Sequence, residues 1–150
     1  MIEIRHIPAD CADALALVDA MWRDVQAIYG TELGPGPSAT PEDFSPPGGA
    51  FVALYEGDRA VAGGGIKRLD AETVEIKRMY VVPDRRGQGL SRQLLVALEG
   101  AARDLGYART RLDTGAEQAA ALRLYPSAGY CSIPDYNNNP YASYWGEKWL

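Results

Sequence analysis

The sequence predicts an α/β fold in which helices pack on a mixed β-sheet. Three observations support this prediction: short segments where apolar and polar residues alternate, longer segments where apolar residues recur at every third or fourth position, and the order of these segments. That order is strand, helix, three strands, helix, strand, helix, strand. It is typical of an α/β sandwich whose single sheet contains both parallel and antiparallel pairs.

The chain begins with a strand and a helix. Residues 2–7 alternate in polarity and predict the strand. A helix is expected from about Asp10, its candidate N-cap, to Tyr29, because apolar side chains there are spaced by three and four residues. Its apolar stripe comprises Leu15, Val18, Trp22, Val25 and Tyr29.

A loop is predicted over residues 31–49, which hold five of the ten prolines and four of the sixteen glycines. One short helical turn is expected near residues 40–44. Loops of this length inside a compact domain are usually functional or disordered. We therefore expect either a segment at a substrate entrance or a mobile, inert one.

Three consecutive strands are expected next. Phe51–Tyr55 and Arg59–Leu69 flank the turn residues 56–58 and predict a hairpin. The run Gly63–Gly65 inside the second strand predicts a β-bulge or a close approach of another part of the chain. A phosphate-binding loop is not expected there, because no helix follows. Thr73–Val82 is the third strand.

Helices and strands alternate in the second half. The strongest helix follows the run PDRRGQG and ends at Gly106. Its apolar stripe comprises Leu90, Leu94, Leu98, Ala101 and Leu105. Arg109–Asp113 predicts a strand, and Glu117–Ala128 predicts a helix that ends at Gly129. An asparagine-rich turn and a strand near Ser143–Leu150 complete the chain.

Composition places the chain among globular proteins. Of its 150 residues 47% are hydrophobic and 23% are charged, which excludes wholesale disorder. A chain of this length buries roughly 68–70% of its unfolded surface, so one domain over residues 1–150 is expected. No run of about 18 apolar residues predicts a membrane span. The first residues lack the apolar core of a signal peptide, so a cytoplasmic protein without a membrane partner is expected.

Metal chemistry is not expected. Cys11 and Cys131 are too few for a disulfide framework, and their spacing fits no metal motif. His6 is the only histidine, whereas a zinc site needs at least three good ligands. The sequence therefore predicts no metal cofactor.

Charge is divided unevenly along the chain, whose formal net charge is −5. Residues 1–75 hold 5 bases and 13 acids, and residues 76–150 hold 10 bases and 7 acids. The excess of bases in the second half is explained by a solvated helix face or by an anion that binds there. A nucleic acid partner is disfavoured, because the chain is acidic overall.

The segment Val82–Ser91, VPDRRGQGLS, is the most specific feature. Pro83 ends the preceding strand, and two glycines spaced by one residue let the backbone turn while exposing N–H groups at the start of a helix. A helix N-terminus of this kind is a ready anion site, because the positive end of its dipole points at the same spot. Arg85 and Arg86 lie near enough in sequence to add charge-assisted hydrogen bonds.

Two other interpretations of this segment do not fit its residues, and a third stays open. A P-loop requires Gly-Lys followed by Ser or Thr, whereas Leu90 follows Gly89 here. A dinucleotide-binding fingerprint requires a small residue where Arg92 stands. A structural turn that binds no ligand stays open as an alternative.

Two motifs together resemble those of the GNAT superfamily of N-acetyltransferases. The run VEIKRMYVVPDRRGQGLSRQLLVALEGAARDLGY is similar to the family's coenzyme A-binding segment, and QAAALRLYPSAGY is similar to its later helix. Asp84 stands where the family has Gln or Arg, and Gln118 stands where it has Asn. The resemblance implies a mixed, mostly antiparallel central sheet that is splayed between two strands, with helices on both faces.

The resemblance also implies an N-acetyltransferase that uses acetyl-CoA as its acyl donor. The donor's thioester arm would insert between two splayed parallel strands, Thr73–Val82 and Arg109–Asp113. The residues implied to bind the cofactor are Met79, Tyr80, Val81, Val82, Arg85, Arg86, Gly87, Gln88, Gly89, Leu90, Ser91, Gln118 and Tyr125.

Two residues are implied to carry the chemistry. Tyr125 is the general acid that protonates the departing thiolate, although its spacing from Leu122 alone predicts a core tyrosine. Glu75 is the candidate general base. Three alternatives remain for that role: Glu75 is an ion-pair partner of Lys77 or Arg78, Tyr80 is the base, or no dedicated base exists.

The acceptor is expected on the side formed by the first helix, the 31–49 loop and the last strand. Aromatic side chains there are Trp22, Tyr29, Tyr136, Tyr141, Tyr144, Trp145 and Trp149, and acidic ones are Glu32, Glu42, Asp43 and Asp135. The acidic first half favours a small amine over an acidic acceptor. The alternatives are a non-catalytic acyl-CoA sensor and an enzyme that acetylates a protein N-terminus or lysine. The last strand is also a candidate edge for pairing in a homodimer.

Overall fold

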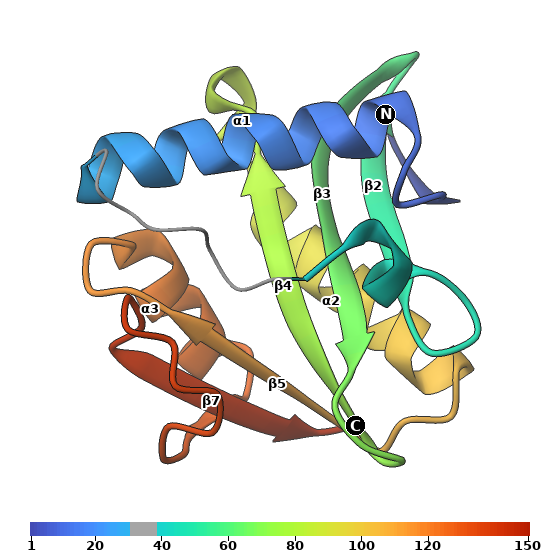
Figure 1. Cartoon of the computed structure of the whole chain (residues 1–150). Coiled ribbons are helices and arrows are strands. Elements are labelled where there is room, and N and C mark those ends of the chain that lie inside the picture. The colour runs from blue at the N-terminus through green and yellow to red at the C-terminus, as the bar shows by residue number, and fades with distance from the viewer. Residues whose placement is uncertain (31–38) are drawn as a thin grey trace.

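The computed structural model describes residues 1–30 and 39–150 of the chain, shown in Figure 1. Its sheet has seven strands in the order β1-β2-β3-β4-β5-β7-β6. The strands are β1 (Ile2–Ile7), β2 (Ala50–Glu56), β3 (Arg59–Arg68), β4 (Thr73–Val81), β5 (Arg109–Thr114), β6 (Cys131–Ser132) and β7 (Tyr144–Trp149). The helices are α1 (Ala12–Tyr29), α2 (Leu90–Asp104) and α3 (Ala119–Ser127), with short 3₁₀ turns at Pro41–Phe44 and Pro83–Arg85.

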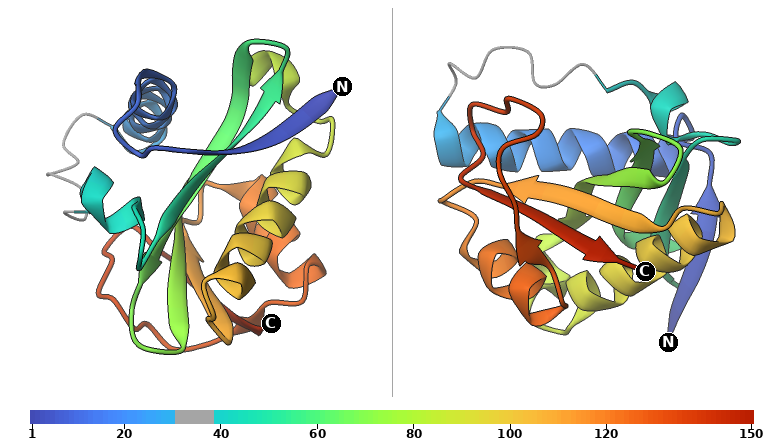
Figure 2. Two further views of the ribbon diagram at one scale, coloured as in Figure 1. Left: turned by 90° about the vertical axis from the view of Figure 1, so that its right-hand side faces the viewer. Right: turned by 90° about the horizontal axis from the view of Figure 1, so that it is seen from below.

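The sheet is mixed and mostly antiparallel, as expected. Only β4 and β5 pair in parallel, and every other neighbouring pair is antiparallel. Helix α1 covers one face, and α2 covers the other together with α3 (Figure 2). Within the described ranges, no helix combines the length and the apolar character needed to cross a bilayer.

Two hydrophobic clusters lie on the two faces of the sheet. The larger cluster packs the apolar stripe of α2 onto the strands, and Leu94 and Leu98 in it are fully buried. Four members of the predicted α2 stripe are buried, whereas Leu105 at the helix end is 39% exposed. The smaller cluster lies under α1 and includes Phe44 from the first 3₁₀ turn, close to where a helical turn was expected.

The predicted start and inward face of α1 were wrong in part. Its N-cap is Cys11 rather than Asp10, because the Cys11 amide bonds to the Pro8 carbonyl and the chain turns once more before the helix begins. Leu15, placed in the predicted stripe, is 48% exposed. Leu17 packs inward instead, where the glycines of β3 leave room for it.

The three glycines of β3 lie where other parts of the chain approach closely, as predicted. A Cβ atom on Gly63 would lie 2.7 Å from Leu17 Cδ1, and one on Gly65 would overlap the ring of Phe44. On the opposite face, a Cβ on Gly64 would lie 3.1 Å from Leu98 Cδ1. The run therefore allows α1, the 3₁₀ turn and α2 to pack tightly on one strand.

A β-bulge in β4 changes the direction of its side chains. Gly63 pairs with Tyr80 and Gly65 with Lys77, so two residues of β4 lie opposite Gly64. One of them, Arg78, has a left-handed φ of 61°. Because one extra residue shifts the alternation by one position, Tyr80 packs in the α1-side cluster instead of the α2-side cluster.

Strands β4 and β5 pair over a short distance and then separate. Their register runs only from Thr73 opposite Arg109 to Glu75 opposite Arg111. Beyond this point β4 continues beside β3, while β5 continues beside β7 (Figure 1). The separation opens a gap in the sheet next to the bulge of β4, as the splayed sheet implied by the resemblance requires.

The last strand is not an open edge along its whole length. The two-residue strand β6, which the sequence did not predict, pairs with β7 at Glu147 and Gly146. The Ile133 amide continues this edge by donating to the Trp145 carbonyl. The chain itself therefore covers residues 145–147 of the strand that was the candidate edge for pairing in a homodimer.

Candidate active site

Two cavities meet at the gap between β4 and β5. The larger, about 540 Å³, lies between α1, the end of β4 and the first turns of α2 and α3, and we call it the donor-side cavity. The smaller, about 200 Å³, lies between α1, β4, β5 and the loop before β7, and we call it the inner cavity. Both cavities are lined by Met21, Val25, Met79, Gln118, Ala121 and Tyr125.

The donor-side cavity collects most of the residues predicted to bind a cofactor. Those on its wall are Met79, Tyr80, Val81, Arg85, Arg86, Gly87, Gly89, Leu90, Ser91, Gln118 and Tyr125. Val82 and Gln88 do not line it. Gly87 and Gly89 have φ values of 78° and 79°, which glycine adopts without strain, and Gly89 caps α2. The unpaired amides of the first turn of α2 therefore start at the cavity wall.

The two arginines of this loop are bound to acidic partners. Arg85 Nη2 lies 2.6 Å from Glu56 Oε1, and Arg86 Nη2 lies 2.6 Å from Asp24 Oδ2. Asp84, which departs from the family pattern, accepts two hydrogen bonds from Arg59, at 2.7 and 2.8 Å. These contacts fix the loop to β2, β3 and α1.

Tyr125 lies at the junction of the two cavities. It is only 7% exposed, and its hydroxyl points to Met79 Sδ at 3.6 Å. Burial raises the pKa of Tyr125 above its ordinary value, and the nearby charge of Asp113 adds to this effect. Tyr125 is thus both a core residue of the α2-side cluster and part of the cavity wall, so the two interpretations of the sequence are compatible.

Glu75, the predicted general base, lies in β4 before the gap and lines neither cavity. Its carboxylate is buried and lies 3.1 Å from Lys77 Nζ. It also accepts hydrogen bonds from Tyr136 Oη at 2.6 Å and from Asn137 Nδ2 at 3.0 Å. The structure therefore brings Tyr125 to the cavities but keeps Glu75 in a polar cluster beside them.

Asp113 is a residue of the inner cavity that the sequence analysis did not single out. Its Oδ2 atom accepts hydrogen bonds from Asn137 Nδ2 at 2.5 Å and from Asn139 Nδ2 at 3.3 Å. Both donors come from the asparagine-rich turn before β7. A polar residue at the carboxyl end of a predicted parallel strand was the available signal, because ligands of open sheets bind beyond such ends.

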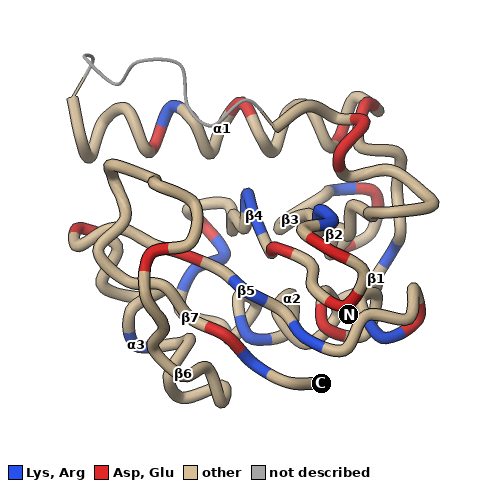
Figure 3. The backbone as a smooth tube through the Cα atoms, turned by 60° about the horizontal axis from the view of Figure 1, so that its bottom comes forward, with Lys and Arg blue, Asp and Glu red and all other residues tan. Residues whose placement is uncertain are grey.

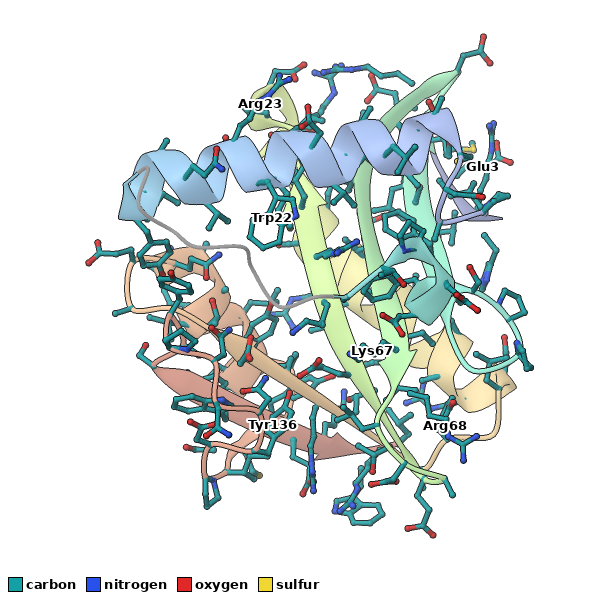
Figure 4. The ribbon with its side chains drawn as sticks, viewed as in Figure 1. Glu3, Trp22, Arg23, Lys67, Arg68 and Tyr136 are labelled. Carbon is teal, nitrogen blue, oxygen red and sulfur yellow. The ribbon has the colours of Figure 1, made fainter. Side chains whose placement is uncertain are left out.

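Three of the predicted aromatic residues line the inner cavity: Trp22, Tyr29 and Tyr141. Trp22 points from α1 toward β4 (Figure 4). The others lie elsewhere; for example, Tyr136 bonds to Glu75 and Trp149 is 60% exposed.

The acids expected to receive a cation do not line this cavity within the described residues, and Glu32 lies outside them. Asp43 and Asp135 instead accept hydrogen bonds from backbone amides of their own turns.

Gln118 has partners within its own turn. Its Oε1 atom accepts hydrogen bonds from the Gly115 amide at 3.0 Å and from Thr114 Oγ1 at 2.8 Å. The side chain thereby connects the end of β5 to the start of α3 and forms part of both cavity walls.

Comparison with known proteins identifies the class of protein that this site defines. Residues 16–130 match the model of the acetyltransferase (GNAT) family. The chain belongs to this family, and it is an acetyltransferase.

Particular relatives agree with this assignment. The chain is 35% identical to the N-acetyltransferase YjgM of Escherichia coli K12, itself uncharacterized, over 76% of this chain and 74% of that one. A Klebsiella pneumoniae structure assigned as an acyl-CoA N-acyltransferase is 31% identical with a TM-score of 0.78, covering 100% and 98% of the two chains. The PaiA N-acetyltransferase of Thermoplasma acidophilum, solved with coenzyme A, shares the fold with a TM-score of 0.73 at 16% identity, covering 100% and 99%.

Proposed function

We propose that this protein transfers an acetyl group from acetyl-CoA directly to the amine of a small molecule. The observation that carries the proposal is the meeting of the two cavities at Tyr125 and Met79. A donor and an acceptor that enter from opposite sides of the gap reach the same point there. The family assignment and the coenzyme A complex of the Thermoplasma protein support the choice of donor.

The donor would occupy the donor-side cavity. Its diphosphate would accept hydrogen bonds from the backbone amides between Gly87 and Ser91, since a helix N-terminus stabilises negative charge. Arg85 and Arg86 would add positive charge at its edge, partly offset by Glu56 and Asp24. The pantetheine arm would follow β4 to Met79, where β5 leaves the strand without a partner.

The size of the inner cavity supports a small acceptor. Its volume is about 200 Å³, below the roughly 300–1,000 Å³ typical of pockets for drug-sized ligands. Residues from α1, β4, β5 and the loop before β7 form its wall. A small metabolite therefore fits this space better than the extended chain of a peptide.

The reaction would form one bond and break one. The amine nitrogen attacks the thioester carbonyl to form a C–N bond, and the C–S bond breaks as the tetrahedral intermediate collapses. We assign the first proton lost by the ammonium to Asp113, because it lines the inner cavity, whereas Glu75 does not. The second N–H proton, lost after the C–N bond has formed, would restore the Tyr125 hydroxyl once that group has protonated the sulfur. Tyr125 is neutral at pH 7 and would donate its proton to the departing sulfur.

Replacement of one hydroxyl tests the role of Tyr125. Tyr125→Phe should lower the turnover number by about 10²-fold or more and leave the Kd for acetyl-CoA little changed, because the phenyl ring still fills the cavity wall. Turnover is measured as free thiol released with a broad panel of amines, and Kd by calorimetry. Tyr144→Phe is the matched control, since the Tyr144 hydroxyl is buried without a hydrogen-bond partner in the described residues.

Three results would contradict the proposal. Unchanged turnover in Tyr125→Phe would remove its role as the acid. Tight binding of acetyl-CoA with no thiol release from any amine would favour a non-catalytic acyl-CoA sensor. A strong preference for peptides over free amines would favour a protein acetyltransferase.

A further inference from the structure

The inner cavity contains a cation that has no acidic partner in the part of the chain that the structure describes. Arg78 lines the cavity and donates from Nη2 to the Ala39 carbonyl, and its guanidinium lies 4.9 Å from the centre of the Phe44 ring. Lys77, the other basic residue on this wall, differs because its ammonium is paired with Glu75 at 3.1 Å. Of these two basic residues, Arg78 is the one that forms no ion pair within the described ranges.

The position of Arg78 is costly for the protein in two respects. Its φ of 61° is a conformation that residues with a Cβ atom rarely adopt. Burial also lowers the pKa of its guanidinium, because the charged form loses water and the charge of Asp43, which forms no ion pair with Arg78, offsets this loss only in part. Strained residues of this kind persist where their environment fixes them, and they concentrate at ligand sites.

The opposite charge on the same cavity wall belongs to Asp113. Its two hydrogen-bond donors, Asn137 and Asn139, are neutral amides, and they both contact Oδ2. Among the residues of the described ranges, none donates a hydrogen bond to Oδ1 or forms an ion pair with this carboxylate. Figure 3 shows that β4 and β5 each carry both acidic and basic residues.

The rest of the inner cavity is largely apolar. Trp22 and Val25 from α1, Ile76 from β4 and the ring of Tyr141 form much of its wall. A ligand that pairs with both charged side chains and covers the apolar wall therefore needs an anionic group for Arg78, a cationic group for Asp113 and an apolar part. An amine without an anionic group would leave Arg78 unpaired in a partly desolvated place.

We infer that the acceptor is a free amino acid with an apolar side chain. This inference rests on the proposed function and adds to it the identity of the second binding group. The amine lies at Asp113 and loses its proton there, the carboxylate accepts hydrogen bonds from the Arg78 guanidinium, and the side chain packs on Trp22 and Tyr141. Arginine suits this task because its planar donors match the two oxygens of a carboxylate.

Matched acceptors test the inference. The panel contains L-phenylalanine and L-leucine, the amines that lack their carboxylate (2-phenylethylamine and 3-methylbutylamine), and the two amino acid amides. Thiol release with acetyl-CoA gives kcat/KM for each. The amino acids should exceed the corresponding amines and amides by about 10²-fold or more, because a buried charge is left unpaired by the other compounds.

Two variants connect this preference to Arg78. Arg78→Gln removes the charge, and Arg78→Gly removes it while giving the backbone a residue that tolerates the positive φ. Both should raise the KM for amino acids at least tenfold and should lower the ratio of kcat/KM for each amino acid to that for its matched amine. Arg68→Gln, an exposed arginine of β3 outside both cavities, is the control. An unchanged melting temperature and acetyl-CoA Kd show that each variant is folded.

The outcomes separate the two proposals. If plain amines or amides are acetylated as well as the amino acids, or if both Arg78 variants keep the amino acid preference, the inference fails and the proposed function stands. If no amine of any kind releases thiol, the proposed function fails as well. Preference for an amino acid that is lost in both variants supports the inference.

Discussion

The two carboxylates beside the gap differ in their partners, and this difference separates their roles. Glu75 has a cation, a phenol and an amide around it, and it lines no cavity. Asp113 faces the inner cavity, and its hydrogen-bond donors among the described residues are both side-chain amides. The Asn137 side chain bonds to both carboxylates, so Glu75 helps to position the turn that orients Asp113.

Replacing each carboxylate with its amide tests which of the two residues, Asp113 or Glu75, is the general base. Asp113→Asn should lower kcat/KM at pH 7 by about 10²–10⁴-fold, the range of a lost general base, with little change in acetyl-CoA binding. Glu75→Gln keeps an acceptor for Tyr136 and should cost far less activity. Steady-state kinetics of both variants checks this. A large loss in Glu75→Gln combined with a small loss in Asp113→Asn would return the base to Glu75, as the sequence predicted.

Among the secondary-structure elements, the loop before α2 is held in part by one exposed aspartate, Asp84. The paired hydrogen bonds from Arg59 lower the pKa of Asp84 from its ordinary value of 3.8 to about 2. A carboxylate whose pKa is lower in the folded state contributes stability above its unfolded pKa and loses it as pH falls through the folded value. For Asp84 this window runs from about pH 4 down to about pH 2.

The pH dependence of thermal unfolding tests this anchor. Asp84→Asn should lower the melting temperature slightly at pH 7, and the further loss between pH 4 and pH 2 should be smaller than in the unmodified protein. The effect is modest because both partners are about half exposed and solvent screens the pair. Asp58→Asn, an exposed residue of the β2–β3 turn, is the control. Equal acid sensitivity of Asp84→Asn and the unmodified protein would contradict the assignment.

Most elements were predictable because their signals are local. The apolar stripe of α2, the hairpin turn and the glycines that stop α2 and α3 depend on residues close in sequence, and these predictions were confirmed. Strand β6 was not predicted, because a two-residue strand has no periodicity. The inward face of α1 was partly wrong, since the space left by Gly63 selects Leu17 and only the folded sheet creates that space.

The residues of the candidate site also divide into those that a local sequence motif predicts and those that no such motif predicts. The loop Gly87–Ser91 and Tyr125 belong to contiguous motifs, and the sequence pointed to both. Arg78 and Asp113 have no such motif, because their exposure to the inner cavity follows from the bulge in β4 and from the early separation of β5. Which of several carboxylates reaches a cavity is set by these tertiary features.

On the scale of the whole molecule, a buried polar group ties α2 to the C-terminal strand. Glu99, which is 3% exposed, accepts a hydrogen bond from Tyr130 Oη at 2.9 Å and lies 3.1 Å from Lys148 Nζ. Thr110 of β5 lies 2.7 Å from the same tyrosine oxygen. Helix α2, β5 and β7 are therefore held together by one network.

Loss of the charge at Glu99 should destabilise the whole fold. Glu99→Gln leaves the Lys148 ammonium without its counter-ion and should lower the free energy of unfolding by about 1.5–3 kcal/mol. Urea denaturation measures this. Adding Lys148→Met to Glu99→Gln should recover part of the loss, because the unpaired cation is then absent. A double variant that is no more stable than Glu99→Gln alone would contradict this account.

The short pairing of β4 with β5 also has a mechanical consequence. Strands β4 and β5 pair only at Thr73–Glu75. The sheet therefore consists of two parts, which we call leaves: β1 to β4 form one and β5 to β7 form the other, and they are joined at one end. Helix α2 contacts β3 and β4 in one leaf and β5 in the other, and its first turn lines the donor-side cavity. A displacement of α2 would change the angle between the leaves, and with it the width open to an acyl chain. If the donor binds as we propose, the length of acyl group that fits would therefore depend on how firmly this helix is held, as well as on the side chains that line the gap.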